Sequence, residues 1–122
     1  NGMNVFSFAI SRPPKSIESF LADYNLDRNV DIDYFLIHQA NKMIVDRIVK
    51  KLKLPQEKVS YNLEEFGNLG GASIPSLMVT RLRGQLLSKE TTLLMSSFGL
   101  GLTWGTMWMK TKPMIIPEIV IM

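Results

Sequence analysis

Apolar residues recur along this chain with two spacings, one typical of helices and one typical of strands. Over residues 13–24, and again over residues 40–53, apolar positions lie three or four residues apart, which predicts two amphipathic helices. The apolar face of the second helix comprises Ile44, Val45, Ile48, Val49 and Leu52. A third helix is predicted over residues 73–87, where Pro75 suits the first turn because the N–H groups of that turn have no helical partner.

Shorter apolar runs predict the strands of a sheet. Tyr34–Ile37 is wholly apolar, as is typical of a strand that is buried on both faces. Residues 91–97 and 102–110 predict two neighbouring strands, separated by the glycine-containing run 98–101. Because strands alternate with helices along the chain, the sequence predicts an α/β fold.

Other stretches have weaker patterns. Residues 3–10 predict a short extended segment and residues 59–63 a further strand, whereas the tail 111–122, rich in proline and isoleucine, matches no element. Residues 71–82 are apolar around most of a helical circumference, which is typical of a helix covered on several sides. We therefore expect the isolated chain to dimerise or to expose a large apolar patch.

Composition limits the chemistry that the chain can perform. Its 122 residues, 46% of them hydrophobic, suffice for one domain. The absence of cysteine excludes disulfides, thiolate metal sites and a cysteine nucleophile within these residues, and a single histidine leaves little material for any metal site. The net charge of +3 allows an acidic partner but is far below that of a nucleic-acid binder. No apolar run reaches the roughly 18 residues of a membrane span, so we expect a cytoplasmic protein.

Three local features occur where α/β folds place their sites, at strand ends and turns. His38 follows the apolar strand, so it is either an oxyanion ligand or proton donor, or a histidine satisfied by neighbouring backbone. Residues 66–73, with Asn68 among three glycines, form either a phosphate cradle before a helix N-terminus, although no P-loop lysine is present, or a plain helix entry. Residues 98–105 either expose the backbone N–H of Leu100 between two glycines or make a tight hairpin connection. No feature decides alone.

Together these features form one ordered set: HQAN at 38–41, the segment from Asn62 to Pro75, and FGLGLTWG at 98–105. This set resembles the C-terminal half of β-ketoacyl-acyl carrier protein synthase III, a family of condensing enzymes in the thiolase-like superfamily. The resemblance runs from about Gly2 to Lys110. Thiolases place their histidine in a different context, whereas chalcone-synthase-like enzymes share the His and Asn pattern and stay an alternative.

The resemblance implies a thiolase-like α/β half-fold over residues 1–110, with a mixed sheet and buried and flanking helices, followed by the tail 111–122. It implies an acyltransferase of fatty-acid or related biosynthesis, whose substrates are coenzyme A and acyl carrier protein thioesters and which needs no cofactor and no metal. A cysteine on an N-terminal half would take the acyl group. His38 and Asn68 would bind a malonyl-type thioester and stabilise its enolate, which attacks the acyl-cysteine. Leu100 would hold the acyl-thioester oxygen through its N–H, and Phe98 would line the site.

The resemblance also implies partners, namely the N-terminal half of the same enzyme, an acyl carrier protein and a second copy in a homodimer. The expected docking residues for the carrier are Lys42, Arg47, Lys50 and Lys51, although such a basic face is also typical of a solvated helix. Three positions depart from the family pattern: Met43, Leu69 and Leu100 stand where arginine, a small polar residue and a small residue are common. These departures suggest a paralogue with a non-standard acyl donor or acceptor.

Two further interpretations compete with the half-enzyme. A non-catalytic binding or dimerisation module could keep the fold without the chemistry, and the coding sequence upstream of Asn1 would distinguish the two. The chain opens without an initiator methionine, from which we expect a fragment that is inactive alone. A nucleic-acid binder is a poor fit, because no aromatic residues are interleaved with the charges of the basic helix.

Overall fold

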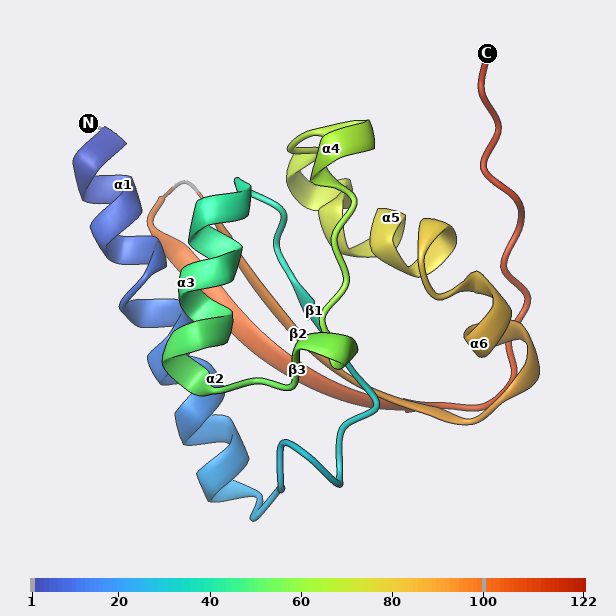
Figure 1. Cartoon of the computed structure of the whole chain (residues 1–122), viewed down its shortest axis with the longest axis horizontal. Helices are drawn as coiled ribbons and strands as arrows, with labels where there is room; N and C mark the ends of the chain where they lie inside the picture. The colour runs from blue at the N-terminus through green and yellow to red at the C-terminus, as the bar shows by residue number, and fades with distance from the viewer. Residues whose placement is uncertain (1, 100) are drawn as a thin grey trace.

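The computed structural model describes residues 2–99 and 101–122. A three-stranded sheet forms its centre (Figure 1): β1 (Tyr34–Ile37) pairs in parallel with β2 (Thr91–Gly99), which pairs antiparallel with β3 (Thr103–Thr111). The helices are α1 (Gly2–Ala9), α2 (Arg12–Asp23), α3 (Lys42–Leu52), α4 (Leu63–Phe66), α5 (Ser73–Thr80) and α6 (Arg83–Ser88), with short 3₁₀ turns at Gln56–Lys58 and Gly70–Ala72. The predicted α/β fold with a mixed sheet is confirmed.

Helices cover both faces of the sheet, and each face has its own apolar core. Helices α1, α2 and α3 lie on one face, and α5 and α6 on the other (Figure 1). Phe35 and Ile37 of β1 pack into the first core, whereas Leu36 between them packs into the second. The strand is wholly apolar because each of its faces is covered.

The loop after β1 is held by the start of α3. Asn41 caps this helix, since its Oδ1 accepts a hydrogen bond from the N–H of Ile44 (2.8 Å). Lys53 ends the helix in a left-handed conformation with φ of 52°. The helix is therefore slightly shorter than residues 40–53, and residues 38–40 form a tight link between the strand and the helix.

Two of the weaker predictions are wrong. Residues 3–10 are helical, not extended: Phe8 and Ala9 are buried in succession, which a half-covered strand does not allow, and the N–H of Ile10 donates to the Phe6 carbonyl (3.1 Å). Residues 59–63 form no strand but only a single parallel bridge from Val59 to Phe35. The chain turns directly afterwards into α4.

The predicted helix over 73–87 is divided into α5 and α6. The break falls beside Arg81, whose guanidinium binds the Tyr61 carbonyl (2.7 Å) and the Glu65 carboxylate, both from a distant part of the sequence.

The tail, which matched no element, packs on α6 through Ile116, whose side chain is buried and whose carbonyl accepts a bond from Arg83 Nε (3.1 Å). Within the described part of the chain, no helix has the length and apolar character that membrane crossing requires.

Candidate active site

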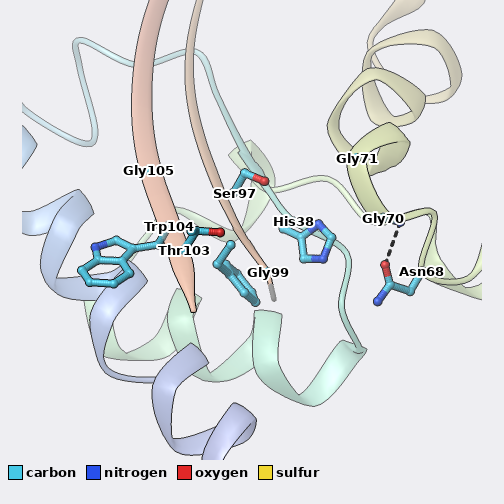
Figure 2. A pocket seen from close by; sticks show the side chains of 10 residues that line it. His38, Asn68, Gly70, Gly71, Ser97, Gly99, Thr103, Trp104 and Gly105 are labelled. Carbon is cyan, nitrogen blue, oxygen red and sulfur yellow. Dashed lines mark hydrogen bonds between the residues drawn. The ribbon is translucent and has the colours of Figure 1, made fainter. Parts of the chain in front are cut away.

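His38 and Asn68 line one pocket of about 580 Å³ beside the carboxyl end of β1 (Figure 2). His38 follows β1, and Asn68 lies in the turn before α5, 30 positions later in the sequence. The fold brings the two residues together. The other lining residues come from that turn and from the joined ends of β2 and β3: Gly70, Gly71, Ser97, Phe98, Gly99, Thr103, Trp104 and Gly105. The three features picked out in the sequence thus meet around a single hollow.

The hollow exists because side chains on one face of the β2–β3 pair become abruptly small. On that face the cross-strand pairs run, in order, Leu93–Met109, Met95–Met107, Ser97–Gly105 and Gly99–Thr103. Side chains alternate between the two faces of a sheet, so these four pairs share a face. The change from leucine and methionine to glycine, serine and threonine leaves space beside His38.

His38 is held firmly by its neighbours and is 7% exposed. Its backbone N–H donates to the carbonyl of Ser96 (2.9 Å), which extends the pairing of β1 with β2 by one residue, and its own carbonyl accepts from the N–H of Ala40 (3.0 Å). The His38 and Phe98 rings pack edge to face, with their centroids 5.0 Å apart and their planes at 79°. Phe98 therefore lines the pocket and also orients the imidazole.

Burial keeps the imidazole neutral. Removal from water lowers the pKa of His38 below its usual 6.5, because desolvation penalises the charged form. A neutral imidazole has one N–H donor and one acceptor nitrogen. Such a donor stabilises negative charge on a ligand oxygen without transferring a proton.

Asn68 presents a second donor. Its Oδ1 accepts a hydrogen bond from the N–H of Gly70 (2.9 Å), and Gly70 itself has a positive φ (58°), which favours glycine there. With the oxygen bound inside the turn, the amide turns its Nδ2 away from Gly70, as Figure 2 shows. Asn68 and His38 can thus both donate to an oxygen placed in the pocket. Leu69, the bulky neighbour, is exposed and is not among the lining residues.

The predicted role of Leu100 concerns a residue outside the described part of the chain. Its neighbour Gly99 ends β2 and lines the pocket, and Gly101 has a φ of 117°, which favours glycine.

The four predicted docking residues lie exposed along α3, but three of them already have partners. Lys42 Nζ lies 2.8 Å from Asp46 Oδ2, and this hydrogen bond raises the pKa of Lys42. Lys51 donates to the Ile10 carbonyl (3.1 Å), and the Arg47 guanidinium lies 5.8 Å from the Phe6 ring centroid. The Lys50 side chain makes no hydrogen bond or ion pair within residues 2–99 and 101–122, and so stays available to a ligand.

The sequence gives no individual role to several residues around the site. Ser97 lies just outside the 98–105 motif and Gly105 at its end, and both line the pocket; the period-two change in side-chain size points to them once the strands are paired. Gln39 and Asn62 belong to the quoted motifs, but that they are buried beside the site and bound to each other follows only from the fold. Among the described residues, no three His, Asp or Glu side chains gather closely enough to hold a metal ion.

Comparison with known proteins gives a consistent match. Residues 21–111 match the family model for the 3-oxoacyl-[acyl-carrier-protein (ACP)] synthase III C terminal. A β-ketoacyl-[acyl-carrier-protein] synthase III of Microcystis aeruginosa is 44% identical over 105 residues, which cover 86% of this chain and 31% of that protein. A protein of the same name from Lactococcus lactis is 39% identical over 107 residues, covering 86% of this chain and 33% of the relative.

Solved structures agree with the sequence matches. A 3-oxoacyl-(acyl-carrier protein) synthase from Burkholderia xenovorans superposes with a TM-score of 0.91 at 34% identity, over 97% of this chain and 34% of that one. A 3-oxoacyl-(acyl carrier protein) synthase III from Pseudomonas aeruginosa gives 0.83 at 32% identity, over 96% of this chain and 36% of that one. The chain spans about a third of the length of these relatives.

Proposed function

This chain belongs to the β-ketoacyl-[acyl-carrier-protein] synthase III family, whose C-terminal region it matches, and we propose that it forms the decarboxylating half of such an acyltransferase. The supporting observation is the shared pocket of His38 and Asn68, in which a neutral imidazole and an amide can donate to one oxygen. The chain has no cysteine, so the nucleophile must come from residues outside these 122.

The proposed reaction is a decarboxylative Claisen condensation. The bond between the carboxylate and the α-carbon of a malonyl-type thioester breaks, carbon dioxide leaves, and the electron pair moves onto the thioester oxygen as an enolate. His38 and Asn68 donate hydrogen bonds to that oxygen as its charge develops. Each preorganised donor of this kind contributes ~3 kcal/mol to the transition state.

The enolate carbon then attacks the carbonyl of an acyl-cysteine thioester, and the cysteine thiolate leaves. The small residues on the pocket face of β2 and β3 give the two thioesters room to approach. Phe98 covers one side of His38 and shields the imidazole from water, and this lower local dielectric strengthens the hydrogen bonds of the ring.

Partners follow from the same proposal. The rest of the polypeptide supplies the cysteine and covers the open side of the pocket, and a second copy completes the dimer. An acidic carrier protein docks on the basic face of α3, where Lys50 is the cation with no partner among the described residues. Met43, which is 56% exposed on the same face, adds an apolar contact to that surface.

The test is to separate the two half-reactions in the complete enzyme. His38→Ala and Asn68→Ala should leave acyl transfer onto the cysteine intact, as followed by mass spectrometry of the acyl-enzyme. Release of carbon dioxide should fall by about 10²-fold or more in each variant, because a donor to the enolate oxygen is lost. Loss of acylation with unchanged decarboxylation would instead mean that His38 activates the nucleophile. Unchanged rates of both steps would favour the non-catalytic module.

A further inference from the structure

A buried polar bridge joins the loop that carries His38 to the segment that leads to Asn68. Gln39, directly after His38, is 0% exposed, and its Nε2 donates to the carbonyl of Ile37 (2.8 Å). Its Oε1 accepts from the backbone N–H of Asn62 (3.2 Å), 23 positions further along the chain. One side chain thus links the end of β1 to the start of α4.

Asn62, which is 2% exposed, extends the bridge to α5. Its Nδ2 donates to the hydroxyls of Ser76 (2.9 Å) and Thr80 (3.3 Å). Each hydroxyl already donates its own proton to a backbone carbonyl, that of Ser73 or of Ser76 (2.7 Å each). Only the amide nitrogen can therefore be the donor in these contacts, which fixes the orientation of Asn62.

From Asn62 the chain reaches Asn68 through a compact segment. The Asn62 carbonyl accepts hydrogen bonds from the N–H groups of Glu65 (3.2 Å) and Phe66 (3.0 Å), which form α4. Asn68 is in turn bound to Gly70 through its side chain (2.9 Å). Any shift of Asn62 relative to Gln39 would therefore change the separation of Asn68 from His38.

The bridge also carries an energetic cost. The orientation that the hydroxyls impose on Asn62 leaves its Oδ1 buried without a partner among the described residues. An unsatisfied buried acceptor costs more free energy than a typical neutral hydrogen bond returns. Apolar side chains of the same volume would avoid that cost, and local conflicts of this kind are expected at functional sites.

We propose that Gln39 is a positioning residue: its bridge to Asn62 sets the separation of His38 and Asn68 so that both donors reach one thioester oxygen. This inference rests on the proposed function of the two donors. It assigns Gln39 no contact with substrate, and its effect on the reaction passes entirely through the placement of His38 and Asn68.

The test uses Gln39→Met in the complete enzyme, because methionine keeps the volume and removes both hydrogen bonds. Carbon dioxide release should fall by about 10²-fold, since misplacement by an ångström has an effect of that size. Acylation of the cysteine should be unchanged. In an Asn68→Ala background, Gln39→Met should lower the rate of carbon dioxide release by less than about threefold, because no second donor is left to misplace.

The control Leu21→Ala removes a buried side chain of α2 and should lower the melting temperature without changing decarboxylation. If Gln39→Met does not fold, Ser76→Ala with Thr80→Val releases Asn62 from α5 and should give the same selective loss. The positioning role is overturned if Gln39→Met lowers carbon dioxide release equally in the wild-type and Asn68→Ala enzymes. It is also overturned if Gln39→Met does not lower it at all. His38→Ala in the same assay tests the proposed function separately: if it leaves decarboxylation unchanged, the function itself fails.

Discussion

At the scale of single residues, the environment of His38 decides what chemistry it can perform. The imidazole is nearly buried, its backbone is fixed to β2, and Phe98 contacts its ring. The burial lowers the pKa of His38 and so favours a neutral ring, which can donate a hydrogen bond, over a charged one. Its partner Asn68 cannot titrate, so the pair keeps its donor character across the physiological pH range.

His38 is the only histidine of the chain, so its titration can be followed directly by NMR. We expect its pKa in the folded chain to lie below the ordinary 6.5, as burial lowers it. Because the unfolded chain then binds a proton more readily than the folded one, folding stability should fall as the pH drops below about 6.5. A resonance that titrates at or above 6.5 would contradict the lowering of the His38 pKa by burial.

At the scale of elements, the site depends on how strands and helices end. β1 leads into α3 over the four residues 38–41, and the Asn41 cap determines where the helix begins and hence how the His38 loop is closed. The end of β2 and the start of β3 carry small residues on one face, which leaves room for the pocket there. The glycine-containing turn before α5 then brings Asn68 to the same place.

Removal of the Asn41 cap should destabilise the fold measurably. Asn41→Ala leaves the N–H of Ile44 without its acceptor, and we expect a loss of about 1 kcal/mol in the free energy of unfolding. Asn41→Asp keeps the cap and should retain most of the stability. Urea unfolding of the three proteins measures the difference, and equal losses for both variants would contradict the capping role.

The sequence predicts the elements whose patterns are local. Residues 34–37 and the apolar face of α3 are evident because burial on defined faces gives apolar residues a run or a regular spacing in the sequence. The division of α5 from α6 is not local, since it falls beside Arg81, which binds Tyr61 and the α4 residue Glu65. For the site, the ordered motifs predicted His38, Asn68 and Phe98, which the fold places in one pocket. The Gln39–Asn62 hydrogen bond could not be predicted, because it joins two separate elements and no local sequence pattern indicates it.

At the scale of the whole molecule, the chain has surfaces that a monomeric domain rarely exposes. Trp104, Met107 and Trp108 of the edge strand β3 are exposed, and Ile74 and Met78 of α5 are only partly buried. The chain also spans only a third of the length of its relatives. We interpret these surfaces as regions that the rest of the enzyme covers.

The isolated 122-residue chain should therefore bind a hydrophobic dye or self-associate in sedimentation experiments. Met107→Lys, at a side chain that is 60% exposed on β3, should weaken dye binding because it adds a charge to the exposed apolar surface around that side chain. The matched control is Val30→Lys, at an isolated side chain that is 77% exposed, and it should have no effect. A monomer that binds no dye would count against the covered surface.

We propose that His38 and Asn68 act together on a single enolate oxygen. The most direct test is a double-mutant cycle in the complete enzyme, with carbon dioxide release measured for His38→Ala, Asn68→Ala and the double variant. If both donors serve one oxyanion, the combined loss should be clearly smaller than the product of the two single losses, because residues that act as a unit couple strongly. Losses that multiply independently would show that the two side chains serve different steps or different atoms, and would overturn the shared oxyanion site.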